Sequence, residues 1–301
     1  MQSDHEGTPA DLDEAASIFA GVQRRLFGLA YRMLGSKAEA EDVVQEVWLR
    51  WQTYDDRESV LDPSAFLVTT AVRLAINAVQ SARARRETYI GPWLPEPIDT
   101  RLDPELGAVR GEALELAVLF LLEKLPATER AAYVLREAFD YPYLQIADIL
   151  ETNEANARQL VSRARGHLAS ERRAPVSPSE QRRLLEAFLR AAQAGDRAAL
   201  EALFAADVAS YADGGGRALA ARVPVVGRAT VAKFVSSFPS KFWVGATFSW
   251  VEVNGGVAIA ISRDGTPFAL LAIDAAAEGI ARLLWAMNPA KLGSVPNADP
   301  G

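Results

Sequence analysis

The segment "LQIADILETNEANARQLVSRARGHL", residues 144–168, has the pattern of two helices joined by a tight turn. Residues 144–150 predict a short helix, residues 151–153 a turn, and residues 154–169 a second helix. At about 100° per residue, one face of the second helix is apolar: Ala157, Leu160, Val161, Ala164 and Leu168. The opposite face is polar, with Asn156 at its N-terminal edge: Arg158, Gln159, Ser162 and Arg163. A DNA-reading helix-turn-helix needs this division, because one face packs and the other meets bases and phosphates.

The alternative interpretation is an ordinary solvated helix, because charge on a helix face usually serves solubility. This alternative is the favoured one for the segment taken alone. The net charge of -7 does not exclude DNA binding, because the charge is distributed in local blocks. Residues 158–173 hold five arginines and one glutamate, and residues 73–86 hold four arginines and no acid. Residues 39–58 instead hold seven acids and two arginines. Local fields decide which surface meets phosphates, so the pattern indicates both a polyanion and a protein partner.

Composition removes many enzyme classes. The 301 residues are 50% hydrophobic and 24% charged, which is ordinary for a globular protein. The absence of cysteine excludes disulfides, thiolate zinc sites and a cysteine nucleophile. The two histidines, His5 and His167, lie in a tail and near a helix end, so we expect no metal site, catalytic residue or cofactor. No apolar run approaches about 18 residues and the N-terminus lacks a secretory pattern, so we expect no membrane span and a cytoplasmic location.

The first half of the chain predicts helices throughout. Apolar residues recur at helical spacing in residues 13–34 and 36–54, and a third helix starts near Pro63 and ends near residue 87. Gly35 is expected to end the first helix, and Ser36 to cap the second. The segment "TYIGPWLPEPIDTRLDPE", residues 88–105, contains four prolines and predicts a connector.

The last third changes character. Residues 179–205 predict two helices around Gly195 and Asp196. The runs "FWVGATFSWVEV", "GVAIAISR", "PFALLAIDA" and "IARLLWAM" follow, separated by "NGG", "DGTP" and "AEG", and they predict consecutive antiparallel strands. The expected fold class is multidomain, with two all-α helical domains, the second a helix-turn-helix, followed by an α+β domain.

Two segments resemble a known family. Residues 125–168, "LPATERAAYVLREAFDYPYLQIADILETNEANARQLVSRARGHL", resemble region four of extracytoplasmic-function (group IV) sigma factors, which reads the promoter −35 element. Residues 26–54, "LFGLAYRMLGSKAEAEDVVQEVWLRWQTY", resemble their region two. Both motifs stand in the expected order around a proline-rich connector. The resemblance implies a factor that binds core RNA polymerase, through the β′ clamp helices and the β flap, and directs initiation at promoter DNA.

The resemblance also implies residue roles. For the −35 element these are Asn156, Arg158, Gln159, Ser162, Arg163 and Arg165. For the polymerase clamp helices they are Asp42, Gln45, Glu46 and Trp48. For the −10 element they are Asn77, Gln80, Arg83, Arg85 and Arg86, where a solvated helix end is the alternative. Core packing is the alternative for Trp48, and it is the favoured interpretation of Trp51.

The final 120 or so residues resemble the SnoaL-like branch of the NTF2-like fold, as found in a sigma-J-like subgroup. Three motifs carry the likeness: "WLPEP" at Trp93, Leu94, Pro95, Glu96 and Pro97, "DGGGR" at Asp213, Gly214, Gly215, Gly216 and Arg217, and "NPAKL" at Asn288, Pro289, Ala290, Lys291 and Leu292. Arg217 replaces the subgroup's lysine and keeps its charge. Ala290 replaces its aspartate, which puts an ion pair there in doubt. The three glycines predict either a docking loop or a plain surface turn.

The predicted organisation places the domain boundaries as follows: a region-two domain at 11–87, a linker at 88–111, a region-four domain at 112–173, a SnoaL-like domain at 180–293 and a tail at 294–301. We expect the last domain to dock through its two motifs and the linker motif, and so to modulate the factor in cis by restraining region two against region four.

Other functions stay open at the level of sequence. The SnoaL-like domain can bind a small molecule, or isomerise one with Asp207 or Asp213 as base, although such chemistry needs further polar groups. A DNA-binding regulator that never engages polymerase is a further alternative.

Overall fold

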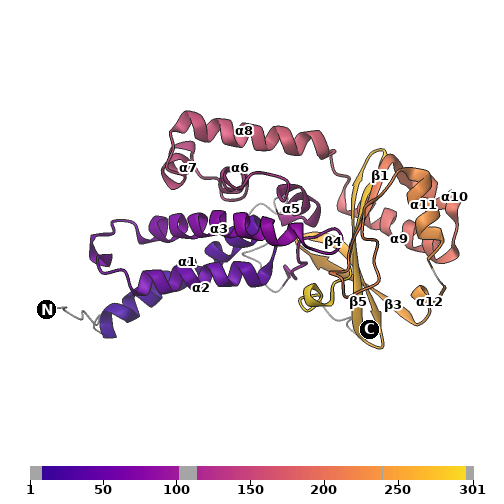
Figure 1. Ribbon diagram of the computed structural model, residues 1–301, viewed down its shortest axis with the longest axis horizontal. Coiled ribbons are helices and arrows are strands. Elements are labelled where there is room, and N and C mark those ends of the chain that lie inside the picture. Colours follow the sequence, from indigo (N-terminus) through magenta and orange to yellow (C-terminus); the bar gives the residue numbers. More distant parts are fainter. Residues whose placement is uncertain (1–8, 102–113, 239, 296–301) are drawn as a thin grey trace. The chain divides into compact units, whose positions relative to one another are not determined.

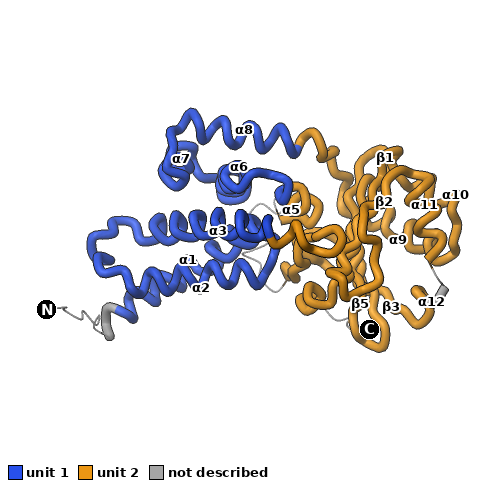
Figure 2. The backbone as a smooth tube through the Cα atoms, in the orientation of Figure 1, with its two compact units in different colours: residues 1–84, 108–113, 122–168 blue, residues 85–107, 114–121, 169–301 orange. Residues whose placement is uncertain are grey.

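The computed structural model describes residues 9–101, 114–238 and 240–295 (Figure 1). The chain divides into two compact units, which Figure 2 colours separately. Unit 1 comprises residues 1–84, 108–113 and 122–168, and unit 2 comprises residues 85–107, 114–121 and 169–301. Both predicted helical segments therefore contribute to unit 1, whereas the linker joins the sheet in unit 2.

Unit 1 begins with three long helices. They are α1 (Pro9–Leu34), α2 (Lys37–Gln52) and α3 (Pro63–Glu87), with a short turn η1 (Arg57–Ser59) before α3. Gly35 adopts a φ of 65°, and the Ser36 hydroxyl accepts a hydrogen bond from the Glu39 amide at 3.4 Å. The predicted end of the first helix and the Ser36 cap are thus confirmed.

The core of these helices is apolar. Trp51 is 1% exposed, and its indole N–H donates to the Ala15 carbonyl at 3.2 Å, so core packing is confirmed for this residue. Helix α3 is the one helix within the described residues that is long and apolar enough to cross a membrane. Its Leu67 and Val72 are buried, and its Arg73 forms an ion pair with Glu151 at 2.8 Å, as in a core helix of a bundle.

The second helical segment of unit 1 contains α6 (Ala127–Tyr133), a π-helical turn (Val134–Ala138), α7 (Tyr143–Ile149) and α8 (Glu154–Glu171). Buried Arg130 joins α6 to the end of α1, because it donates to the Met33 carbonyl at 2.6 Å and to Glu123 at 2.9 Å. Burial lowers the pKa of Arg130 to about 10, which leaves it charged at neutral pH. The two helical segments thus share a buried cation.

Unit 2 contains a six-stranded sheet with strand order β2-β1-β6-β5-β4-β3. Its strands are β1 (Phe204–Asp213), β2 (Val225–Val226), β3 (Ala246–Val253), β4 (Gly256–Arg263), β5 (Thr266–Ala276) and β6 (Gly279–Ala286). Strands β3 to β6 form the predicted antiparallel succession, whereas β1 pairs in parallel with β6. Strand β1 was not predicted, and its first residues, Phe204 and Ala205, were wrongly expected to end a helix. The segment "FAADVASYAD" lacks a clear alternation and becomes a strand by pairing with β6.

The expectation of a strand at Phe242 and Trp243 is wrong. These aromatic residues belong to a helical turn, α12 (Ser240–Trp243). Gly245 follows with a φ of 70°, a conformation that glycine adopts readily, and the strand begins only at Ala246. Aromatic residues favour strands on average, but here their packing in an aromatic cluster determines the local backbone.

Helices α9 (Pro178–Ala194), α10 (Arg197–Leu203) and α11 (Arg228–Ser236) complete the described part of unit 2 together with α5 (Leu116–Leu122). Gly195, with a φ of 65°, ends α9, and Asp196 caps α10 through a 3.0 Å bond from the Ala199 amide. Phe188 of α9 packs near Phe204 and Trp285, with ring centroids 6.1 and 6.0 Å apart. The α9 and sheet faces therefore share one aromatic core.

We predict that Phe188→Ala lowers the free energy of unfolding by about 3–5 kcal/mol, because it removes a buried ring from this core and leaves a cavity. Urea unfolding followed by tryptophan fluorescence measures the change. Arg190→Ala, on the exposed side of the same helix, is the matched control and should cost less than about 0.5 kcal/mol. Equal losses in both variants would contradict the packing assignment.

Candidate nucleic-acid interface and linker clasp

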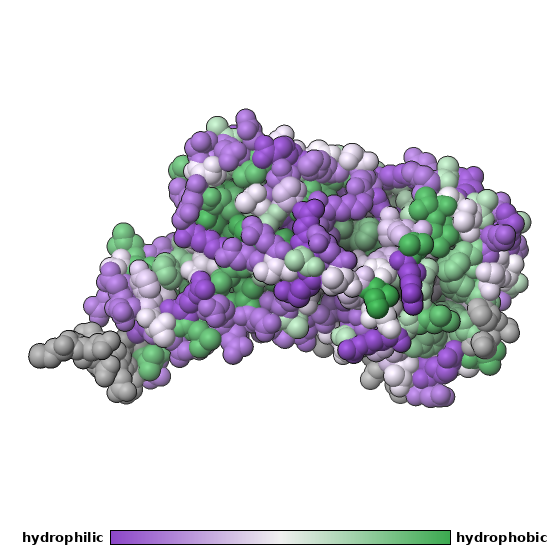
Figure 3. All heavy atoms as spheres, viewed as in Figure 1, coloured by the Kyte–Doolittle hydropathy of each residue, from purple (hydrophilic) through white to green (hydrophobic). Residues whose placement is uncertain are grey.

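Helix α8 presents the two faces that the sequence predicts. The residues predicted to pack are all buried: Ala157, Leu160, Val161, Ala164 and Leu168. Those predicted to face DNA are exposed, apart from half-buried Asn156: Arg158, Gln159, Ser162, Arg163 and Arg165. Hydrophilic side chains gather over this helix in the space-filling view (Figure 3). The geometry suits major-groove contact, while the DNA-contacting roles remain predictions.

The start of α8 is held by side-chain caps. Asn153 accepts a hydrogen bond from the Asn156 amide at 2.8 Å, and the Asn156 side chain donates to Thr152 at 2.8 Å. Gln159 and Ser162 are exposed and, among the described residues, make no side-chain hydrogen bond. Their polar atoms are therefore free to bond base edges.

The arginines of α8 each have a carboxylate partner. Arg158 pairs with Glu154 one turn earlier, Arg163 with Glu129 at 2.8 Å, and Arg165 with Glu137 at 2.6 Å. Glu129 and Glu137 lie in the preceding helical elements, 34 and 28 residues away, and the sequence analysis did not single them out. DNA phosphates would have to replace these carboxylates. The exposed Arg158–Glu154 pair permits this exchange, because such a pair contributes about 0–1 kcal/mol, whereas Glu129 is buried and holds Arg163 more firmly.

The predicted −10 residues fall on both sides of the boundary between the two units. Asn77, Gln80 and Arg83 are exposed on the part of α3 that belongs to unit 1. Arg85 and Arg86 belong to unit 2, where the Arg86 guanidinium lies 3.5 Å from the centroid of the Trp93 ring. Arg86 is therefore stacked on the linker and is not a freely solvated helix end.

The predicted polymerase-binding residues lie along α2. Asp42 and Gln45 are exposed, and half-buried Glu46 forms an ion pair with Arg50 at 2.8 Å. Trp48 is half-buried against Phe19, with ring centroids 5.0 Å apart, so packing accounts for part of its side chain. The acidic face remains available to a protein partner, as the local charge pattern predicts.

A cluster in unit 2, which we call the linker clasp, joins the linker to the ends of two strands. It consists of Tyr89, Leu94, Asp213, Asn288 and Lys291. Asp213 at the end of β1 is fully buried, and its carboxylate accepts from the Tyr89 hydroxyl at 2.5 Å, the Leu94 amide at 2.9 Å and the Lys291 ammonium at 2.7 Å. Lys291 also donates to the Leu94 carbonyl. Each charged group is thereby paired and hydrogen-bonded, as buried charges require.

The polar atoms around the clasp are tied into the same network. The Asn288 amide donates to the Tyr89 hydroxyl at 2.9 Å, while its carbonyl accepts from the Ala290 amide at 3.1 Å. Burial raises the pKa of Tyr89, with the Asp213 hydrogen bond as a second cause. Burial lowers the pKa of Lys291 to about 8, and Asp213 opposes that shift. The replacement at Ala290 does not remove the ion pair, because Lys291 makes it with Asp213.

The glycines next to Asp213 allow close approach to this network. Gly215 has a φ of 58°, and a Cβ atom built on it would lie 2.3 Å from the Asn288 side chain. A Cβ on Gly214 would lie 2.7 Å from the Ala218 carbonyl oxygen, and one on Gly216, with a φ of 71°, 2.9 Å from the Ile90 side chain. Of the two interpretations of this loop, the geometry favours docking over a plain surface turn.

The linker makes further contacts with the sheet domain. Lys291 lies 4.0 Å from the Trp93 ring centroid, so Trp93 meets two cations, Lys291 and Arg86. The Ile98 amide donates to the Asn254 side chain at 3.1 Å, and the Asn254 amide donates to the Ile98 carbonyl at 3.0 Å. Other predicted docking residues are buried as well: Leu94, Pro95, Pro97 and Leu292. Arg217 and Pro289 are exposed, and Glu96 is half-buried.

Sequence reasoning missed Tyr89 and Asn254. Tyr89 stands four residues before the linker motif, and its hydroxyl joins the network only because the chain returns 124 residues later. Asn254 looks like an ordinary turn residue in "NGG", yet it is fully buried with a φ of 55°. A left-handed asparagine before glycine is a usual turn signal, so its second role in holding the linker has no separate sequence signal.

The described part of unit 2 contains a cavity of about 330 Å³ beneath the loop that follows the three glycines. Its lining includes Phe234, Phe238, Phe242, Trp285 and Met287, and no charged residue is found among the described residues that line it. Neither residue considered as a catalytic base contributes, because Asp213 belongs to the clasp and Asp207 pairs with Arg173. The hydrogen bond from Arg173 lowers the pKa of Asp207. The isomerase alternative therefore lacks its expected carboxylate.

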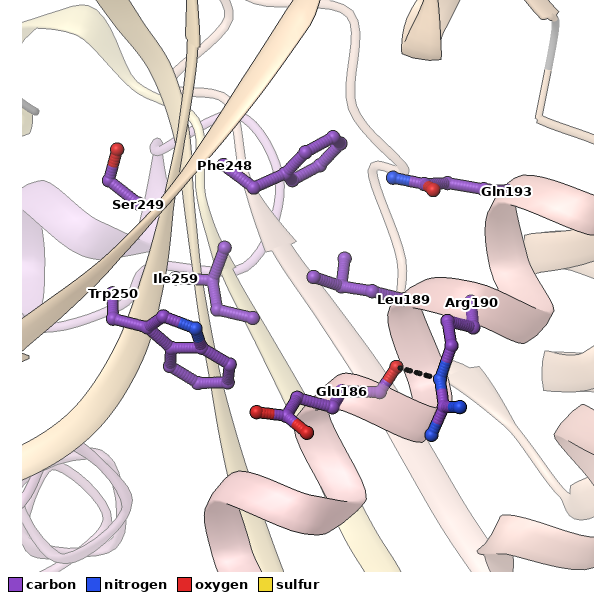
Figure 4. A pocket seen from close by; sticks show the side chains of 8 residues that line it. All are labelled: Glu186, Leu189, Arg190, Gln193, Phe248, Ser249, Trp250 and Ile259. Carbon is purple, nitrogen blue, oxygen red and sulfur yellow. Dashed lines mark hydrogen bonds between the residues drawn. The ribbon is translucent and has the colours of Figure 1, made fainter. Parts of the chain in front are cut away.

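A second, more open recess of about 480 Å³ lies between α9 and strands β3 and β4 (Figure 4). Phe248 and Trp250 project from β3 toward the helix, whereas Ser249 points away, as strand alternation requires. Leu189 faces Ile259 across the recess, and Arg182 lies 4.2 Å from the Trp250 ring centroid. This recess is a partly solvated seam between helix and sheet.

Known proteins match both the sequence and the structure. Residues 18–85 match sigma-70 region 2, and residues 115–168 match sigma-70 region 4. The chain is 37% identical over 235 residues to the ECF RNA polymerase sigma factor SigJ of Mycobacterium tuberculosis, covering 76% of this chain and 74% of that protein. It is 32% identical over 188 residues to the probable ECF RNA polymerase sigma factor SigI of the same species, covering 61% and 64%.

The crystal structure of M. tuberculosis SigJ covers 94% of this chain and 99% of its own, with a TM-score of 0.74 and 31% identity. Together, region 2 and region 4, which contains the helix-turn-helix, define a sigma-70-type initiation factor, here with a C-terminal SnoaL-like domain. The chain belongs to the extracytoplasmic-function sigma factors, and it directs promoter-specific initiation by RNA polymerase.

The clasp predicts a pH effect on stability. Burial lowers the pKa of Lys291 from its ordinary value of 10.5 to about 8 in the folded protein, so above pH 8 this residue binds more protons in the unfolded chain. The contribution of Lys291 to the free energy of unfolding should therefore rise with pH from 8 to 10. Urea unfolding of wild type and Lys291→Met at pH 7.5 and 9.5 measures this, with exposed Lys233→Met as control. A contribution that falls over this range would contradict the assignment.

Proposed function

We propose that the linker clasp holds this sigma factor in a restrained state and that opening the clasp releases it for promoter opening. The observation that carries the proposal is the position of Arg86, a predicted −10 contact, over the ring of Trp93 in the docked linker. A guanidinium stacked there has to leave Trp93 before it can bind a DNA strand. The SnoaL-like domain thus acts in cis on the region that melts the promoter.

The hydrogen bonds of the linker clasp make undocking of the linker costly in free energy. Asp213 and Lys291 are buried only while the linker supplies the Tyr89 hydroxyl and the Leu94 backbone groups. Removing one member of a buried pair costs about 3–5 kcal/mol, since it leaves the other charge unpaired. Each kcal/mol shifts the ratio of docked to undocked linker roughly fivefold. A change in one clasp residue can therefore redistribute the two states.

The remaining roles follow from the family. In this proposal Asp42, Gln45, Glu46 and Trp48 bind the β′ clamp helices, and region four meets the β flap and the −35 element. Support comes from the exposed acidic residues of α2 and the exposed polar face of α8. A cytoplasmic location follows, because the factor must meet polymerase and promoter there. Family membership disfavours a DNA-binding regulator that never engages polymerase.

We predict that Asp213→Asn raises run-off transcription with core polymerase by roughly fivefold or more, because it leaves Lys291 without a counter-charge and loosens the linker. Asp207→Asn is the matched control. Asp207 lies on the same strand as Asp213, but its carboxylate is largely exposed and pairs with Arg173. Thermal unfolding of both variants establishes that the domain is folded. Unchanged transcription by folded Asp213→Asn would refute the regulatory role.

We predict that Arg158→Ala weakens holoenzyme binding to a −35-containing promoter and lowers the slope of log K against log salt concentration by about 0.9, the value for one phosphate contact. Arg158 is preferable to Arg163, whose loss would leave buried Glu129 unpaired. Arg197→Ala removes a similar exposed i,i+4 ion pair in the SnoaL-like domain and serves as control. An equal slope in wild type and Arg158→Ala would exclude Arg158 from phosphate contact.

A further inference from the structure

We propose that the 330 Å³ cavity of the SnoaL-like domain binds an uncharged, mostly apolar small molecule that accepts a hydrogen bond from Trp285. The binding site stands on its own geometry, while its effect on the linker rests on the function proposed above. The volume lies near the lower end of the range for ligand pockets, about 300–1,000 Å³. A compact one- or two-ring compound matches that space.

The chemistry of the wall selects the ligand class. Aromatic and aliphatic side chains dominate it, and none of the lining residues that the structure describes is charged, which disfavours an ionic ligand. Trp285 lines the cavity and is 2% exposed, yet its indole N–H has no acceptor within the described part of the chain. A buried donor without an acceptor is uncommon and costly in folded proteins. A carbonyl or ether oxygen on the ligand would satisfy it.

Water is a poor occupant of this cavity. An ordered buried water needs two to four polar partners, and apolar cavities stay dry. The other polar side chain in the wall, Ser237, already donates its hydroxyl hydrogen to the Phe234 carbonyl at 2.7 Å. At the mouth, Leu219 is 97% exposed, so an apolar side chain stands in solvent beside an apolar cavity. Leu219 could pack against an apolar ligand bound in the cavity.

The cavity and the linker clasp share a wall. Ala212 and Met287 line the cavity and directly precede Asp213 and Asn288 of the clasp, and the Met287 amide donates to the Asp213 carbonyl at 2.8 Å. The end of strand β1 and the two residues that follow strand β6 thus each place a cavity residue next to a clasp residue.

The cavity loop also touches the linker itself. Gly91 of the linker lies against this loop, since a Cβ atom built on it would be 3.8 Å from the Ala221 carbonyl oxygen and 3.7 Å from Arg222 Cα. A ligand that fits the cavity in this state stabilises the docked linker, because ligands favour the state that binds them.

Two neutral fluorescent probes test the binding site in the full-length protein: 6-propionyl-2-dimethylaminonaphthalene, which has a ketone, and N-phenyl-1-naphthylamine, which has none. We expect saturable binding of both probes by the wild type. Ala221→Phe, which fills the mouth, should weaken both by about tenfold or more. Trp285→Phe should weaken the ketone about five- to tenfold and leave the amine unchanged.

Trp243→Phe is the matched control, because Trp243 also has a buried indole N–H without an acceptor among the described residues but does not line the cavity. It should bind both probes as the wild type does, and thermal unfolding establishes that all variants are folded. Absence of saturable binding, or equal binding by folded Ala221→Phe, would overturn the site. Equal loss of both probes in Trp285→Phe would overturn the hydrogen bond.

Hydrogen exchange separates this inference from the regulatory proposal. Saturating ketone probe should slow exchange of the linker amides, residues 89–98, at least about twofold if binding favours the docked state. Unchanged exchange with a bound probe would overturn the coupling between cavity and linker. The effect of Asp213→Asn on transcription is measured without a probe. The transcription test can therefore refute the regulatory role without affecting the ligand site, and the binding test can refute the ligand site without affecting the regulatory role.

Discussion

The buried pair of Asp213 and Lys291 is the constraint on which the arrangement of unit 2 depends. Two charges withdrawn from water are tolerated only when each is paired and its remaining bonding positions are filled. The sheet domain supplies both charges, but the linker supplies the Tyr89 hydroxyl, the Leu94 amide and the Leu94 carbonyl. The sheet domain therefore reaches a fully bonded state only with the linker docked, and the proposed regulation depends on this requirement.

Local signals predicted much of the fold from sequence alone. Helix ends followed from backbone chemistry at single residues, such as Gly35 and the Ser36 cap. The two faces of α8 followed from its 3.6-residue period. Strand β1 could not be predicted in this way, because its alanine-rich sequence has no alternation of its own and its strand state depends on β6, about 70 residues later.

The contacts of the candidate site were even less predictable from local sequence patterns than strand β1. The motif residues Leu94, Asp213 and Lys291 were expected to dock, but which atoms meet is set by contacts across 78 to 197 residues. Tyr89 and Asn254 have no pattern that marks them, and the carboxylate partners of Arg163 and Arg165 lie in other helical elements. Residue type predicts what a side chain can bond, whereas only the folded chain determines its partner.

The arginines predicted to contact DNA therefore differ in the free energy needed to release them from their present partners. Arg158 of α8 pairs with an exposed carboxylate and can exchange it for phosphate with little cost, whereas Arg163 pairs with buried Glu129 and exchanges at a higher cost. Arg86 instead lies over Trp93 beside a buried ion pair, so its release requires the linker to move. Under the proposed mechanism, −35 contact can form while the linker is docked, whereas −10 contact waits for the clasp to open. Regulation then acts on promoter opening rather than on promoter recognition.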